Sequence, residues 1–166
     1  HHADVKLVFV GDGPLRESLQ QRCPQAVFAG MRRHEELAGY YASADLFVFP
    51  SLTETFGNVT IEALASGLPV LAFDTAAAGD WVQSHTNGWL VPAGQDAAFV
   101  RVAVNLAQSP SLLDQAREQA RSRVAHLDWQ QIAAQVEGLM LQAAGASPTV
   151  DAVLRTVMTQ RSAPLL

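Results

Sequence analysis

Apolar residues gather in short runs along the first part of the chain, and more polar segments separate these runs. Residues 6–10 read KLVFV and are followed by the turn Gly11-Asp12-Gly13-Pro14. A short apolar run next to turn residues is typical of a strand that is buried on both faces of a sheet. Later runs of the same kind predict strands at residues 26–30, 46–51, 69–74 and 88–91.

The segments between these runs predict helices. In residues 33–43, for example, Leu37, Tyr40 and Tyr41 recur on one helical face. Gly67 ends another such segment, because glycine is favoured just past the end of a helix. Residues 75–79 are predicted as a loop that leads into residues 80–84. Helices are expected at residues 15–22, 33–43, 58–66, 96–107, 111–125 and 129–144.

Strands that alternate with helices form parallel βαβ units. The pattern therefore predicts an α/β fold, in which a Rossmann-like parallel sheet carries helices on both faces. We expect one domain at residues 1–144, and residues 145–166 as a linker followed by a C-terminal helix. The linker reads GASP, and the apolar residues beyond it recur at helical spacing: Val150, Val153, Leu154, Val157 and Met158.

Composition narrows the classes of function. The formal net charge of -5 argues against nucleic acid as a partner, because phosphate backbones attract basic surfaces. Cys23 is the only cysteine, so one chain can hold neither a disulfide framework nor a cysteine-based zinc site. No apolar run reaches the ~18 residues that a membrane-spanning helix needs, and the start has no secretory pattern. We therefore expect a cytoplasmic protein.

The segment after the strand at residues 46–51 is the most informative for chemistry. It reads ETFGNVTIE, so Glu54 and Glu62 stand eight residues apart on either side of a predicted helix start. A helix start that follows a strand is a common site for anions such as phosphate. Two carboxylates repel phosphate, but they accept hydrogen bonds from hydroxyls. Helix N–H groups that donate hydrogen bonds to phosphate, next to carboxylates that accept hydrogen bonds from hydroxyls, predict a site for a sugar nucleotide.

Four runs, in the same order, resemble the C-terminal half of the retaining GT-B glycosyltransferases of family 4. They read VFVGDGPLRESL, VFAGMRRHEELAGYYASADLFVFPS, ETFGNVTIEALASGLPVLA and NGWLVPAGQDAAFVRVAVNLA, and the third contains the E-x7-E motif of that family. The resemblance covers residues 5–144. It implies a domain that binds a nucleotide diphosphate sugar in an enzyme that transfers the sugar with retention of the anomeric configuration.

The resemblance also implies roles for individual residues. Glu62 corresponds to the glutamate that binds the ribose hydroxyls, and Glu54 to the catalytic glutamate that contacts the donor sugar. The backbone amides of Gly57, Asn58 and Val59 are expected to face the sugar or the diphosphate. Gly30 and Met31 are expected near the base.

Gly11 and Arg32 are weaker candidates, each with a simpler alternative. The backbone of the Gly11 turn can line a sugar-nucleotide cleft, or it can be only a tight turn between strand and helix. A dinucleotide fingerprint is disfavoured, because Arg16 stands where its third glycine is needed. Arg32, next to Arg33, can balance diphosphate charge or lie in a solvated turn. Glu62 and the amides at the helix start likewise have simpler alternatives, a solvated helix carboxylate and a helix cap.

The family resemblance sets expectations for substrates and partners. The donor is expected to be a UDP- or GDP-sugar, and no metal is expected, since the chain has no Asp-x-Asp pair. The acceptor, a carbohydrate or a lipid, is expected to bind through an N-terminal domain that is absent here, and the full enzyme can associate peripherally with the inner face of the membrane.

The family's first βα unit, with its Arg and Lys, has no counterpart in this chain, and the loop at residues 76–81 lacks the family's paired glycines. We therefore expect this chain alone to be inactive, although a non-catalytic nucleotide-sugar-binding module and a GT-B-type epimerase or phosphorylase stay open as alternatives.

Overall fold

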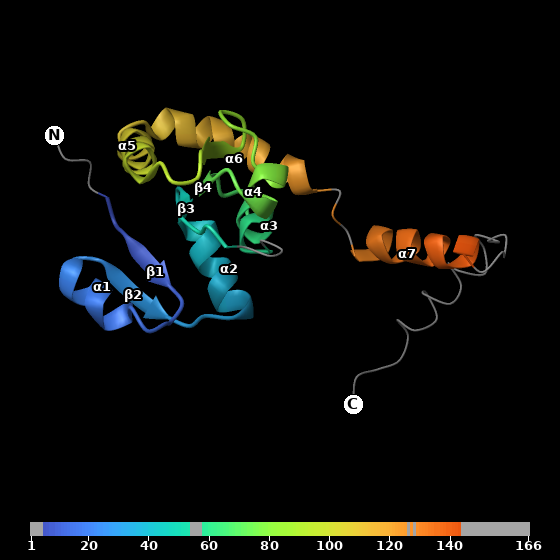
Figure 1. The fold of residues 1–166 in the computed structure, drawn as a ribbon, viewed down its shortest axis with the longest axis horizontal. Helices are drawn as coiled ribbons and strands as arrows, with labels where there is room; N and C mark the ends of the chain where they lie inside the picture. Colours follow the sequence, from blue (N-terminus) through green and yellow to red (C-terminus); the bar gives the residue numbers. More distant parts are fainter. Residues whose placement is uncertain (1–4, 54–57, 126, 128, 144–166) are drawn as a thin grey trace. The chain divides into compact units, whose positions relative to one another are not determined.

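The computed structural model describes residues 5–53, 58–125, 127 and 129–143. The chain divides into two compact units, residues 1–126 and residues 127–166. In its described part, the first unit contains the strands and helices from β1 to α6, and the second contains helix α7 (Figure 1). The domain boundary predicted after residue 144 lies outside the described residues and stays a prediction.

The elements follow in the order β1 (Val8–Val10), α1 (Arg16–Arg22), β2 (Val27–Gly30), α2 (His34–Ser43), β3 (Phe47–Phe49), α3 (Asn58–Ala65), β4 (Val70–Phe73), α4 (Ala76–Trp81), β5 (Gly88–Val91), α5 (Asp96–Ala107), α6 (Pro110–Val124) and α7 (Trp129–Ala143).

The larger sheet has the order β3-β4-β5, and all its strands are parallel. Phe47 lies opposite Val70 in the first pair, and Val70 lies opposite Gly88 in the second. All residues of β4 are buried, as expected for a central strand that is covered on both faces. Parallel strands joined by helices confirm the predicted α/β class.

Helices cover both faces of this sheet. On one face, Leu71 and Phe73 of β4 join a buried cluster with Phe99 of α5 and Leu113 of α6. Successive strand residues point to opposite faces, so Val70 and Ala72, which are equally buried, face the other side. Helices α3 and α4 also contact β4, and α3 contacts α6 as well (Figure 1). The result is a layer of strands between two layers of helices.

The smaller sheet pairs β1 with β2 in parallel and is separate from the larger one. The rings of Phe9 and Phe28 stack across this pair, with centroids 4.7 Å apart. Among the described residues, β1 and β3 each have one edge without a paired strand. Val8 and Val10 on β1 and Val48 on β3 are exposed. Among the described residues β2 and β5 likewise each have one edge without a paired strand, and apolar side chains are exposed on both β1 and β3.

The loop predicted at residues 75–79 is wrong, because helix α4 already begins at Ala76. Thr75 has an extended backbone and is the N-cap of α4, and three alanines follow it. Alanine has the highest intrinsic helix propensity, so this segment forms a helix. The amide of Val82 closes the last turn by donating to the carbonyl of Ala78 at 2.9 Å.

Gly88→Ala should destabilise the first unit, because β5 can approach β4 closely only without a side chain here. A Cβ at this position would collide with the main-chain oxygen of Val70 and would lie 2.9 Å from Cγ1 of Val82. We expect the free energy of unfolding to fall by about 1–3 kcal/mol, as measured by urea denaturation.

Gly39→Ala is the matched control, since Gly39 lies in α2 and a Cβ there meets no atom within 4 Å. This change should leave stability unchanged or raise it by about 0.5–1 kcal/mol, because alanine is the better helix former. Equal effects of the two substitutions would contradict the packing described for Gly88.

Candidate functional site

The carboxyl ends of β3, β4 and β5 lie at the same edge of the sheet, because the strands are parallel. Helices α3, α4 and α5 follow these strands in the chain, so they begin beyond that edge. In open α/β sheets this edge is the usual place for ligands, and the free N–H groups of a helix start bind anions. The glutamate motif of the sequence lies at the β3–α3 connection of this edge.

Asn58 and Val59 are the first two residues of α3. Their N–H groups have no carbonyl partner within the helix, as in the first turn of any α-helix. The helix itself therefore leaves both groups available to a capping residue or a ligand, and the ligand contact predicted for them stays a prediction. Glu54 and Gly57 lie outside the described residues, so their predicted roles stay predictions.

Glu62 lies one turn into α3, and its side chain is exposed. Its Oε2 accepts a hydrogen bond of 3.2 Å from the hydroxyl of Tyr41 in α2. Tyr41 is only 8% exposed, and its ring packs edge-to-face on Phe47 of β3, with centroids 5.7 Å apart. A buried aromatic ring thus links the motif glutamate to the sheet.

The environment of Tyr41 keeps its hydroxyl protonated. Burial raises the pKa of Tyr41 well above its ordinary value, and the negative charge of Glu62 and the hydrogen bond to it raise this pKa further. The hydroxyl therefore donates to the carboxylate throughout the neutral pH range. Oε2 of Glu62 is therefore held by Tyr41, while Oε1 makes no hydrogen bond to any described residue.

Gly11 and Gly30 meet at the carboxyl ends of β1 and β2. The amide of Gly11 donates to the carbonyl of Gly30 at 2.9 Å, and the two residues have φ angles of 133° and 75°. Such angles favour glycine, which explains both residues without a ligand. Met31 follows and is 60% exposed.

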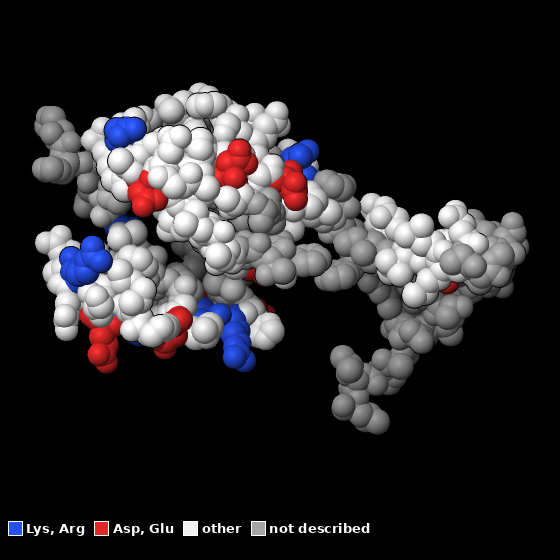
Figure 2. All heavy atoms as spheres, in the orientation of Figure 1, with Lys and Arg blue, Asp and Glu red and all other residues white. Residues whose placement is uncertain are grey.

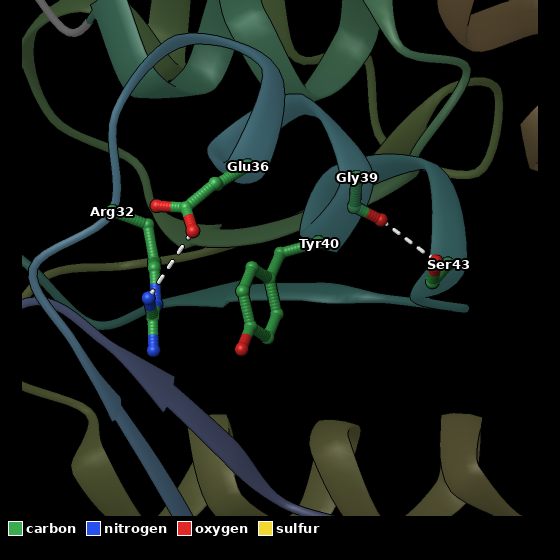
Figure 3. Close-up of a pocket in the computed structure, with 5 residues that line it drawn as sticks. All are labelled: Arg32, Glu36, Gly39, Tyr40 and Ser43. Carbon is green, nitrogen blue, oxygen red and sulfur yellow. Dashed lines mark hydrogen bonds and ion pairs between the residues drawn. The ribbon is translucent and has the colours of Figure 1, made fainter.

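Arg32 lines an open hollow of about 550 Å³ along one side of α2. Its Nη1 lies 3.4 Å from Oε1 of Glu36, and its side chain and that of Tyr40 point to the same side of the helix (Figure 3). Gly39 and Ser43 complete the lining. Nε of Arg32 is buried and has no hydrogen-bond partner.

The predicted site residues therefore form two groups. Gly11, Gly30, Met31 and Arg32 belong to the ends of β1 and β2, and Asn58, Val59 and Glu62 belong to α3. Among the described residues, no hydrogen bond or ion pair joins one group to the other.

Tyr41 is the residue that sequence reasoning missed. It was expected only on the apolar face of its helix.

Charge is spread thinly over the described surface. On the face seen in Figure 2, acidic and basic side chains lie singly or in small groups among uncharged ones. The described residues contain no cluster of three or more His, Cys, Asp or Glu side chains that could hold a metal ion. Within the same part of the chain, every helix is too short or too polar to cross a bilayer.

A model of the family described as "Glycosyl transferases group 1" matches residues 1–109. The matched segment contains β1 to β5 as well as Tyr41 and Glu62. It covers more than half of the chain and includes both groups of predicted site residues.

Individual proteins are similar over parts of their lengths. A GDP-mannose-dependent alpha-mannosyltransferase from Mycobacterium tuberculosis is 50% identical over 91 residues, which are 55% of this chain and 24% of that protein. The structure of sucrose-phosphate synthase from Thermosynechococcus elongatus matches 86% of this chain and 39% of that one, with a TM-score of 0.75 and 32% identity. The C-terminal domain of a glycosyl transferase group 1 family protein from Francisella tularensis matches 67% of this chain and 60% of that one, with a TM-score of 0.59 and 23% identity.

These likenesses confirm the predicted Rossmann-like α/β fold. The chain spans about a quarter of the length of the GDP-mannose-dependent alpha-mannosyltransferases that it matches.

Proposed function

This chain belongs to the glycosyl transferases group 1 family, and from that premise we propose that it is the donor-binding domain of a retaining hexosyltransferase. The observation that carries the proposal is the carboxylate of Glu62, one turn into the helix that follows β3. One of its oxygens accepts from Tyr41, and the other makes no hydrogen bond to a described residue. A carboxylate in this position can accept hydrogen bonds from sugar hydroxyls, while the N–H groups of the helix start bind phosphate.

Each part of the sugar-nucleotide donor is assigned to particular site residues. Glu62 accepts hydrogen bonds from the ribose hydroxyls, and Glu54 contacts hydroxyls of the transferred sugar as the catalytic glutamate. The amides at Gly57, Asn58 and Val59 face the sugar or the diphosphate. The backbone of Gly30 and Met31 lies near the base, while Gly11 and Arg32 border the diphosphate. The position of Asn58 and Val59 at the start of α3 and the exposure of Met31 are compatible with this assignment.

The reaction depends on electrostatic stabilisation. When the carbon–oxygen bond to the diphosphate breaks, negative charge grows on the leaving oxygen and positive character on the anomeric carbon. Helix N–H groups stabilise the leaving oxygen, and the glutamates orient the ribose and the sugar. The acceptor hydroxyl then attacks from the face that the leaving group vacates, which retains the configuration, and its proton passes to the departing diphosphate oxygen.

We propose a GDP-sugar as the donor and GDP-mannose as the first one to test, with UDP-sugars as the alternative. The support is the mannosyltransferase from Mycobacterium tuberculosis, whose name states its dependence on GDP-mannose, and its identity of 50% to this chain. The acceptor is a carbohydrate or a lipid that binds to another domain of the full-length enzyme, which acts in the cytoplasm or at the inner face of the membrane.

The open strand edges support a proposal about the domain itself. We propose that the full-length enzyme places a further parallel strand between β1 and β3, as part of the βα unit that brings an Arg and a Lys to the diphosphate. That strand would pair with both open edges and cover exposed apolar residues such as Val8, Val10 and Val48. Residues 1–144 would then be the donor domain without this unit, residues 145–166 a linker and helix, and the chain alone inactive.

Glu62→Ala in the full-length enzyme should weaken the binding of GDP or UDP without unfolding the protein. A hydrogen bond to a charged group contributes about 1.5–3 kcal/mol, so affinity should fall roughly 10–150-fold in calorimetric titrations. Glu118→Ala removes an exposed glutamate from α6 and serves as the control. If both variants bind like the wild type, Glu62 does not contact the nucleotide.

Glu54→Gln should impair the reaction of the sugar nucleotide without changing the binding of the bare nucleotide. Affinity for the bare nucleotide diphosphate should stay the same, while turnover of the sugar nucleotide should fall steeply, because only the sugar loses its contact. The measurement compares calorimetric affinity with kcat in this one variant. An equal loss for nucleotide and sugar nucleotide would place Glu54 on a different part of the donor.

Transfer should persist in EDTA. The chain lacks the Asp-x-Asp pair that holds a divalent ion in metal-dependent transferases, and helix N–H groups supply the stabilisation of the leaving group instead. Initial rates with and without the chelator test this expectation. Activity that disappears in EDTA and returns with manganese would refute it.

A further inference from the structure

We propose that Tyr41 is a positioning residue, which holds the carboxylate of Glu62 in the orientation that receives the ribose of the donor. The inference rests on the proposed function of Glu62 and adds a residue to which neither the motif nor the family resemblance assigns a role. The geometry that points to it is the 3.2 Å hydrogen bond from the Tyr41 hydroxyl to Oε2 of Glu62, across 21 residues of sequence.

The sheet fixes the donor end of this hydrogen bond. The ring of Tyr41 is buried and meets the ring of Phe47 at an interplanar angle of 80°. Phe47 is the first residue of β3, and its amide donates to the carbonyl of Pro69 at 2.9 Å. The hydroxyl therefore has a fixed position relative to the strand that precedes the motif.

The acceptor end needs such support. Glu62 is exposed, and an exposed glutamate on a helix samples several staggered rotamers. No ion pair to Glu62 is found among the described residues. The other side-chain hydrogen bond at this position runs from Oγ of Ser66 to the main-chain oxygen of Glu62 at 2.9 Å, and it does not restrain the carboxylate.

A phenol suits this task better than a cation. A neutral donor orients the carboxylate and leaves its negative charge available to the ligand, whereas Arg or Lys would neutralise it. An ionised carboxylate has about four lone-pair sites, so a bond at Oε2 leaves room for both ribose hydroxyls. Because the raised pKa keeps Tyr41 protonated, its hydroxyl donates to the carboxylate and adds no negative charge beside the ligand.

The expected effect of removing the hydroxyl follows from side-chain freedom. Tyr41→Phe keeps the ring against Phe47 but frees one or two torsions of Glu62, each of which has three staggered wells. Refixing them on binding should weaken GDP or UDP affinity roughly 3–9-fold. The loss should be smaller than that of Glu62→Ala, which removes the carboxylate itself.

A double-mutant cycle on the full-length enzyme tests the inference. GDP and UDP are each titrated by calorimetry into wild type, Tyr41→Phe, Glu62→Ala and the double variant. Ser66→Ala is the matched control, because it deletes a hydroxyl that bonds residue 62 only at its main chain. Thermal melting of each variant measures any change in stability.

The inference predicts that Tyr41→Phe weakens binding in the wild type, has no effect in the Glu62→Ala background, and melts like the wild type, while Ser66→Ala binds normally. If Glu62→Ala weakens binding but Tyr41→Phe does not, the positioning role is wrong and the proposed function stands. An equal loss in both backgrounds would show that Tyr41 acts without Glu62 and would overturn the inference as well. If Glu62→Ala has no effect, or the wild type binds neither nucleotide, the proposed function fails first.

Discussion

The burial of β4 on both faces is the constraint from which the rest of the first unit follows. Its neighbours β3 and β5 run parallel to it, so each connection between them must cross the sheet through a helix. All three strands therefore end at one edge, and the helices that follow them begin there. Side chains that are distant in the sequence can act together only because this edge gathers them.

The link between Tyr41 and Glu62 shows how the core reaches the site. Phe47 belongs to β3, Tyr41 packs on it from α2, and the Tyr41 hydroxyl bonds the carboxylate on α3. The orientation of the exposed Glu62 carboxylate thus depends on the buried ring of Tyr41, which belongs to a different helix. In our account, the same edge-to-face contact that packs α2 on β3 also sets the direction of a ligand contact.

Most of the fold could be predicted from the sequence, because its signals are local. Apolar runs mark the strands, and Gly67 ends α3 where helix C-terminal chemistry requires it. The loop predicted at residues 75–79 differs from the structure because three alanines with high helix propensity begin α4 there. The need for glycine at position 88 arises from a strand 18 residues earlier, and the hydrogen bond of Tyr41 joins α2 to α3 across 21 residues of sequence. Neither long-range contact leaves a local pattern in the sequence.

The central claim, that Glu62 receives the ribose of a nucleotide sugar, is tested most directly by a crystal structure of the full-length enzyme with GDP bound. The account predicts that ribose hydroxyls lie within hydrogen-bonding distance of the Glu62 carboxylate, roughly 2.5–3.0 Å, and that the Tyr41 hydroxyl still donates to its other oxygen. A ribose bound away from Glu62, with this carboxylate in solvent, would contradict the account.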